Sequence, residues 1–468
     1  MIDRLFKPVP TFVTRKKKQH FTIEIVKEKS HKAWLKKQST SIQTAADTQS
    51  FSPKGSALLL HPEQKIVYAL IADKVEIYDG AKVYAAVVKA FAKDALDKVS
   101  FDYSGLSGKD AENFCIGWGL GGYAFDAYKS ETKPKACLVL PSSTKNTPIL
   151  SKVASIFMLR DLVNTPSNDL GPEEIEKTVK KLAKEHEATV KVVKDQKQLE
   201  KDFPLVHMVG KASPRLPRLI ELNWGSTKNP KVTLVGKGVV FDTGGLDIKP
   251  SQYMRYMKKD MGGSAHTIAL AKLIMDHNLP VRLRLIIPAV ENAVAGEAFR
   301  PGDIVKSRKG LYVENTNTDA EGRLILADAL TYASENKPDI IIDYATLTGS
   351  ARAGLGPDIP ALFSNSDKIA SKIQKTSEKT EDPVWVMPLW QPYRKHIEKS
   401  VGDLLNSAGL PGDLIYSALF LESFVEKDID WVHLDCYAWE HSGKAGRPVG
   451  GADTGLLTLF QYLQDRYG

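Results

Sequence analysis

The chain has 468 residues, of which 43% are hydrophobic and 26% charged, a balance typical of folded globular proteins that argues against wholesale disorder. This length exceeds the size at which one hydrophobic core keeps growing, so we expect two domains. Three scattered cysteines, Cys115, Cys137 and Cys436, form neither a disulfide framework nor a CxxC zinc site, which favours a reducing, cytoplasmic compartment.

The first 150 residues have the pattern of a small N-terminal α/β domain, and we assign 151–468 to a second, larger domain. In the first domain the pattern predicts strands over 65–70, 75–78 and 136–140 and a helix over 81–99, with a further helix over 153–162 after the boundary.

From residue 151 onward, strand and helix patterns alternate. This alternation predicts a mixed, largely parallel central sheet flanked by helices, so the chain as a whole belongs to the α/β class. The predicted strands cover 232–236, 282–290, 339–344 and 431–435, and the predicted helices cover 265–275, 324–334 and 414–425.

The sequence contains no run of 18 apolar residues and no pattern of a secretory signal, so we expect neither a membrane span nor secretion. The net charge of +8 could indicate a nucleic-acid partner, but the lysines are spread along the chain. Only Arg15–Lys18 forms a basic run, which a solvated segment explains better. DNA binding is therefore retained only as an added role.

One glycine motif is interpreted as structural. The stretch Gly117–Gly122 fits the G-x-G-x-x-G pattern of dinucleotide-binding proteins, but residues 109–114 before it have a helical rather than a strand pattern. We therefore expect close helix packing there. The sequence lacks G-x-S-x-G and H-E-x-x-H, so any metal would need oxygen ligands rather than paired histidines.

Four carboxylates and a lysine stand in two glycine-rich segments, each of which follows a predicted strand and precedes a predicted helix. The segments are 235–263 and 315–324, and the residues are Lys237, Asp242, Asp260, Asp319 and Glu321. Each Asp alone is typical of a helix cap or turn. Ligands of open α/β sheets, however, bind beyond the carboxyl ends of the strands, and four carboxylates gathered there would repel one another. Two divalent cations roughly 3.5–4 Å apart would relieve that repulsion and support hydrolysis.

The segment Asn317-Thr-Asp-Ala-Glu-Gly-Arg-Leu324 is identical to the signature of the leucyl aminopeptidase (M17, cytosol aminopeptidase) family. The stretches Gly236–Gly245 and Asp260–Gly263 closely match the other metal-binding part of that family, and Arg160–Asn164 and Ala418–Glu422 match as well. Over residues 152–468 the chain is identified as a member of this family.

The resemblance implies a metal-dependent aminopeptidase with two divalent cations per subunit, Mn²⁺ or Zn²⁺ with Mg²⁺ as an alternative. It implies that Asp242 and Glu321 bridge the ions, that Lys237 and Asp260 complete the tightly held site, and that Asp319 completes the exchangeable one. Lys249 would stabilise the oxyanion formed on the peptide carbonyl, and Arg323 would hold a bicarbonate ion. We rank this anion role of Arg323 above a structural salt bridge. A homohexamer acting on peptides is also implied.

By the same resemblance, Met257, Thr346, Leu347 and Gly349 line the pocket for the first side chain, which suits release of an apolar residue such as Leu or Met. Two positions depart from the family pattern. Lys259 stands where an apolar residue is common, and Tyr437 stands where small residues are usual. These departures predict a reshaped pocket. An inactive homologue and a phosphoester hydrolase fit less well, because every metal position is filled and no phosphate-binding cluster occurs.

Overall fold

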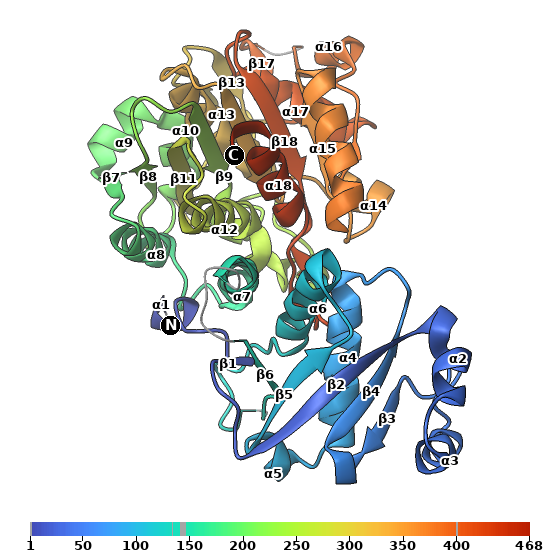
Figure 1. The fold of residues 1–468 in the computed structure, drawn as a ribbon. Coiled ribbons are helices and arrows are strands. Elements are labelled where there is room, and N and C mark those ends of the chain that lie inside the picture. Colours follow the sequence, from blue (N-terminus) through green and yellow to red (C-terminus); the bar gives the residue numbers. More distant parts are fainter. Residues whose placement is uncertain (1, 133, 141–146, 399–400) are drawn as a thin grey trace. The chain divides into compact units, whose positions relative to one another are not determined.

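The computed structural model describes residues 2–132, 134–140, 147–398 and 401–468. The chain forms two compact units (Figure 1). The larger unit comprises Met1–Leu5, Met158–Glu440 and Gly450–Gly468, and the smaller comprises Phe6–Phe157 and His441–Val449. The domain boundary expected near residue 150 stays a prediction.

The smaller unit is built on a six-stranded sheet in the order β1-β6-β5-β2-β4-β3. Its strands pair in parallel except for β3, which runs antiparallel to β4. The strands are β1 (Phe12–Val13), β2 (Gln19–Lys27), β3 (Leu58–His61), β4 (Ile66–Ile71), β5 (Val99–Ser104) and β6 (Cys137–Val139). The helices are α2 (His31–Lys36), α3 (Thr40–Thr48), α4 (Ile77–Ala90), α5 (Lys93–Leu96) and α6 (Gly108–Gly121), followed by α7 (Thr147–Asn164).

Helices α4 and α6 pack backbone to backbone through glycines. A Cβ on Gly117 would lie 1.7 Å from Ile77 O, and one on Gly80 would lie 2.1 Å from Phe114 O. Any side chain at either position would force the helices apart, which explains why glycine stands there. The motif at 117–122 therefore serves helix packing, as expected.

Two expectations for this unit were wrong. The strand expected over 75–78 is instead the start of α4, where the Asp79 carboxylate accepts a hydrogen bond from Glu76 N at 2.9 Å in a capping box. The helix expected over 81–99 ends at Ala90, and Val99 opens β5. The apolar run in 81–99 thus continues across a helix end into a strand, which periodicity alone does not separate.

The larger unit contains a mixed sheet in the order β16-β15-β18-β14-β9-β11-β8-β7, with β10 paired to β11. The central strands β18, β14, β9 and β11 run parallel, whereas β8, β7 and β15 pair antiparallel to their inner neighbours. The strands are β7 (Thr189–Val193), β8 (Arg218–Trp224), β9 (Lys231–Gly236), β10 (Gly238–Asp242), β11 (Arg282–Asn292), β14 (Ile340–Ala345), β15 (Ala361–Ser364), β16 (Trp385–Val386) and β18 (Asp430–Asp435). This agrees with the mixed, largely parallel sheet predicted from the sequence.

Helices cover both faces of this sheet (Figure 1). One layer contains α12, α15 and α18, and the other contains α10, α13 and α17, whose apolar side chains form a large buried core with β9, β11 and β14. The helices of the unit are α1 (Ile2–Leu5), α8 (Pro172–Glu185), α9 (Gln196–Asp202), α10 (Pro204–Gly210), α11 (Ser251–Met254), α12 (Gly262–Asp276), α13 (Glu321–Ser334), α14 (Gly349–Leu355), α15 (Asp367–Thr380), α16 (Arg394–Ile397), α17 (Asp413–Glu422) and α18 (Leu456–Tyr467). In the described parts of the chain, no helix is long and apolar enough to cross a membrane.

The central strands end together at one edge of the sheet. The register pairs Tyr344 of β14 with Gly236 of β9, and Ala345 with Asp435 of β18. The segments that follow these strands therefore converge beyond the sheet. The 3-10 helix η3 (Met257–Met261) lies among these segments. Two small sheets complete the described strands: one contains β12 (Ile304–Lys306), β13 (Tyr312–Glu314) and β17 (Leu404–Leu405), and the other contains β19 (Trp439–Glu440) and β20 (Gly450–Gly451).

Candidate metal centre

Carboxylates from three elements meet at this edge. Asp242 ends β10, Glu321 opens α13, and Asp319 lies in the loop just before α13. One carboxylate oxygen from each of these three residues lies within 4.8 Å of the others. Asp260, in η3, joins the same cluster through Lys237.

Two lysines bind the carboxylates together. The Lys237 ammonium lies 2.7 Å from Asp260 Oδ2 and 2.9 Å from Glu321 Oε1, and it donates to Thr346 O at 2.9 Å. The Lys249 ammonium lies 2.8 Å from Asp242 Oδ2 and also pairs with Asp319 Oδ1. The five residues expected to bind metal and Lys249 therefore occupy one cluster.

The cluster holds more carboxyl groups than amines. Burial, together with the charge of Asp242, raises the pKa of Asp319 to about 7 and that of Glu321 well above its usual range. Burial would lower the pKa of Lys237 and of Lys249, but the surrounding carboxylates raise both. Two ammonium groups therefore do not neutralise four carboxylates.

Three buried oxygens in this cluster accept no hydrogen bond of good geometry from the described residues: Asp260 Oδ2, Asp319 Oδ1 and Glu321 Oε1. Their neighbours at ion-pair distance are the two lysines. Each ammonium group is thus shared between two carboxylates, and burying four carboxylates beside only two amines is costly. Oxygen atoms with one amine nitrogen form a ligand set that suits hard divalent cations, so the residues fit such ions.

The Asn292 side chain and the Gly244 backbone position Asp242, and the sequence interpretation missed Asn292. The Asn292 amide donates to Asp242 Oδ1 at 2.8 Å and to Thr318 O at 3.1 Å. Gly244 N also donates to Asp242 Oδ1 at 2.9 Å, and Gly244 has a φ of +88°, a conformation that favours glycine. Asn292 ends β11, so its place at a strand end was the signal that could have revealed it.

Asn406 holds the loop that carries Asp319. Its amide nitrogen donates to Asn315 Oδ1 at 2.8 Å and to Asn317 O at 2.7 Å, and its amide oxygen accepts from Thr316 N at 2.7 Å. Asn406 is buried and lies about ninety positions away in the sequence, so no local pattern indicated this role.

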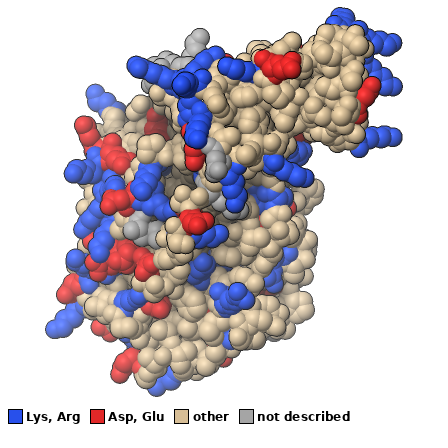
Figure 2. Space-filling view, turned by 90° about the horizontal axis from the view of Figure 1, so that it is seen from below, with Lys and Arg blue, Asp and Glu red and all other residues tan. Residues whose placement is uncertain are grey.

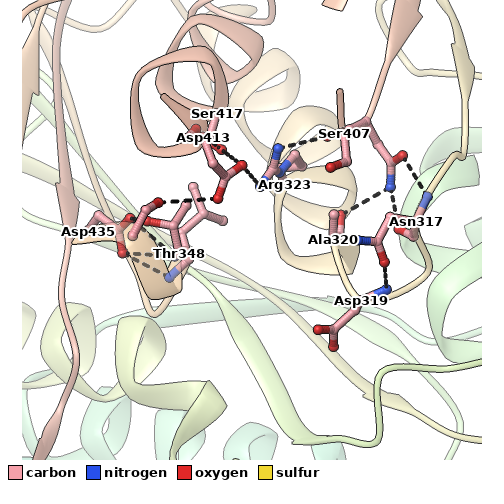
Figure 3. A network of polar contacts seen from close by, with 12 residues as sticks. Asn317, Asp319, Ala320, Arg323, Thr348, Ser407, Asp413, Ser417 and Asp435 are labelled. Atoms are coloured by element: carbon pink, nitrogen blue, oxygen red, sulfur yellow. Dashed lines mark hydrogen bonds and ion pairs between the residues drawn. The ribbon is translucent and has the colours of Figure 1, made fainter. Parts of the chain in front are cut away.

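Arg323 is the third residue of α13, two positions after Glu321. It donates from Nη1 to Asn406 O at 2.8 Å, and Nη2 lies 3.2 Å from Asp413 Oδ1 (Figure 3). The Arg323 Nε is buried and has no acceptor among the described residues. The structural ion pair, which the sequence interpretation ranked below anion binding, is therefore present. The anion role stays a prediction.

The comparisons with known proteins agree with this geometry. Residues 157–459 match the model of the cytosol aminopeptidase family, catalytic domain, and residues 21–141 match that of the M17 aminopeptidase N-terminal domain. A probable cytosol aminopeptidase from Roseiflexus castenholzii is 37% identical over 74% of this chain and 74% of its own length. The chain belongs to the M17 cytosol aminopeptidase family.

Solved structures extend the likeness to the whole fold. The crystal structure of the cytosol aminopeptidase from Coxiella burnetii has a TM-score of 0.91 and 41% identity, covering 98% of this chain and 100% of that chain. The bottromycin maturation enzyme BotP in complex with Mn has a TM-score of 0.83 and 29% identity, covering 95% and 99%. As a member of M17, the chain is a metal-dependent aminopeptidase.

In this M17 chain, one of the four residues expected to line the substrate pocket contacts Asp260 directly. Thr346 donates its hydroxyl to Asp260 Oδ1 at 2.8 Å, and Leu347 N donates to Asp435 Oδ1 at 3.0 Å. Met257 opens η3, and Gly349 opens α14. Their role in specificity stays a prediction.

An open recess of about 920 Å³ borders the other side of the cluster in this aminopeptidase. It is lined by Phe241, Lys249, Pro250, Ser251, Gln252, Met254 and Arg255. Lys249 therefore faces both the carboxylates and accessible space.

Proposed function

We propose that the chain removes single residues from the N-termini of peptides with the help of two divalent cations. Asp242 and Glu321 would bridge the cations, Lys237 and Asp260 would complete one site, and Asp319 would complete the other. The observation that supports this most strongly is the excess of buried carboxylates over lysines, with one oxygen each of Asp242, Asp319 and Glu321 within 4.8 Å of the others.

A pair of divalent cations in such a cluster supplies a nucleophile from water near neutral pH and polarises a carbonyl group. For this chain's residues, Lys237 must act as a neutral amine ligand, which requires its proton to leave when the cations enter. Lys249 would then release Asp242 and Asp319 and donate a hydrogen bond to the oxygen of the scissile carbonyl.

Arg323 is proposed to hold a small anion, bicarbonate by family resemblance. Its Nε has no acceptor among the described residues, so one donor remains for an anion while Nη1 and Nη2 fix the guanidinium plane. The leaving peptide would occupy the recess beside Lys249.

The identity of the metals is proposed as Mn²⁺ or Zn²⁺, with Mg²⁺ as an alternative. Carboxylate ligation without His or Cys favours Mn²⁺ or Mg²⁺ in at least one site. The structure of BotP, which is similar in fold, is a complex with Mn.

A homohexamer in the cytoplasm is proposed from family resemblance. DNA binding is the alternative added role. On the face drawn in Figure 2, Lys and Arg side chains are scattered, with Asp and Glu among them, rather than joined in one band. Only the net charge of +8 supports DNA binding, so the peptidase role is the main proposal.

The test is hydrolysis of Leu-p-nitroanilide with Mn²⁺, with a chelator, and with the α-amine acetylated. We expect turnover only with metal and a free α-amine. Asp319→Ala should abolish turnover while the protein stays folded, because Asp319 lies in a loop with a partly exposed side chain. Asp367→Ala, on an exposed helix turn, is the matched control. Full turnover in the presence of chelator would refute the proposal.

A further inference from the structure

A buried lysine whose side-chain nitrogen has no acceptor among the described residues lies beside the metal cluster. Lys259 immediately precedes Asp260 in η3, and only 5% of its surface is exposed. Among the described residues its side-chain nitrogen makes no hydrogen bond and no ion pair. Burial lowers the pKa of Lys259, and the nearby charge of Asp260 offsets this only in part. A buried amine without a hydrogen-bond partner is unfavourable, and its charged form becomes favourable only when an acceptor reaches it, so this position suits an acceptor from outside the chain.

An aromatic ring brings a second cation next to Lys259. The Lys259 Nζ lies 4.6 Å from the centre of the Tyr437 ring, and the Arg352 guanidinium carbon lies 4.9 Å from the same ring. Arg352 Nη1 also donates to the Tyr437 hydroxyl at 3.1 Å. Both cations are thus fixed by one side chain, and the guanidinium cannot lose its charge.

This group of Lys259, Tyr437 and Arg352, which we call the cationic trio, borders the expected pocket for the first side chain. Tyr437 follows Cys436, whose N donates to Ala345 O at 2.9 Å beside the end of β14. Arg352 lies three positions after Gly349 on α14, hence on the same helix face.

Space is open beside Gly349, which is exposed at the start of α14. A Cβ added to Gly349 would have no described atom within 4 Å. Met257 and Leu347, the two apolar residues expected to line the pocket, are both partly exposed.

We propose that the pocket selects peptides whose first residue carries a carboxylate, Glu or Asp, bound by the cationic trio. The inference rests on the proposed aminopeptidase function and replaces the apolar preference expected from family resemblance. The substrate carboxylate supplies the acceptor that Lys259 lacks, through charge-assisted hydrogen bonds. A Leu side chain would leave the Lys259 amine buried without an acceptor, so a substrate that begins with Leu lacks this hydrogen bond. A pocket merely filled by Tyr437 would instead favour Gly or Ala.

The decisive comparison uses Glu- and Gln-p-nitroanilide, which differ in charge but hardly in shape, with Leu- and Ala-p-nitroanilide beside them, all with Mn²⁺. We expect kcat/KM for Glu to exceed that for Gln by about tenfold or more, as charge-assisted hydrogen bonds allow. Lys259→Met should bring the Glu/Gln ratio close to one. Arg352→Met, on a partly exposed helix position, should lower it as well and tests the idea even if Lys259→Met fails to fold. Lys379→Met, an exposed lysine on α15, should leave the ratio unchanged.

The outcomes separate this inference from the function on which it rests. Hydrolysis of Leu or Ala substrates with a Glu/Gln ratio at or below one would overturn the carboxylate preference and leave the aminopeptidase intact. A high ratio that survives both substitutions would overturn the assignment to the cationic trio. Failure to hydrolyse any of the four substrates would overturn the proposed function itself.

Discussion

Gly322 lies against the side chain of Lys237 so closely that a Cβ at Gly322 would be 2.4 Å from Lys237 Cε and 2.6 Å from Nζ. Lys237 is fully buried and is fixed by Asp260, Glu321 and the Thr346 carbonyl, so it has little room to move. Glycine at the second position of α13 therefore leaves free the space that the Lys237 side chain occupies to reach the carboxylates.

Gly322→Ala should therefore displace the Lys237 amine without harming the helix, since Ala is the better helix former. We expect kcat/KM for a good substrate to fall by about 10- to 100-fold, the range seen when the support of a metal site is disturbed. Gly296→Ala is the control, because a Cβ there meets no described atom within 4 Å. Equal activity of the two variants would contradict the steric argument.

Asn406→Ala should reduce both stability and activity. It removes the side-chain hydrogen bonds to Asn315, Thr316 and Asn317, and we expect a loss of about 2–4 kcal/mol in the free energy of unfolding. The freed loop carries Asp319, so kcat should fall at least about tenfold. Urea unfolding and steady-state kinetics would measure the two effects.

Asn365→Ala serves as the matched control for Asn406. Its amide also makes two long-range hydrogen bonds, to Ile429 O and from Trp431 N, both at 2.8 Å. This variant should lose stability and keep its kcat. If both variants lost activity in proportion to stability, Asn406 would have no special positioning role.

Local signals in the sequence predicted the α/β class, the main strands of the larger sheet and the cluster of carboxylates. β2 was missed although Phe21, Ile23 and Ile25 alternate as in a half-buried strand, so that signal was available. Asn406 and Asp413 could not be predicted in this way. Their contacts to Thr316 and Arg323 span 90 sequence positions and depend on how β17 and α17 pack, which no short pattern encodes.

The buried carboxyl of Asp328 predicts a dependence of stability on pH. It lies on α13 and accepts hydrogen bonds from Leu205 N and Arg308 N, both at 2.8 Å, while burial raises its pKa to about 7. Between about pH 4 and pH 7 the folded state keeps a proton that the unfolded chain has released. This group therefore lowers the free energy of unfolding as pH rises through that window.

Asp328→Asn removes the titrating group, so the variant should gain stability relative to the parent protein as pH rises from 5 to 7. The expected gain is about 2–3 kcal/mol, because each pH unit in the window contributes about 1.4 kcal/mol. Urea unfolding at both pH values measures it. A difference between the two proteins that does not change with pH would show that Asp328 is already ionised when folded.

Metal binding should reverse the order of stability between the parent protein and Asp319→Ala. Without metal, Asp319 adds a fourth negative charge to a buried cluster, so its removal should leave the melting temperature equal to or above that of the parent. With Mn²⁺, the parent should gain about 2.7 kcal/mol at a hundredfold excess over Kd for each site, and the variant should gain less because one site has lost its ligand. Thermal scans with chelator and with Mn²⁺ measure both effects without relying on turnover. If the variant melted below the parent by the same margin in both conditions, Asp319 would act as a structural residue and not as a metal ligand.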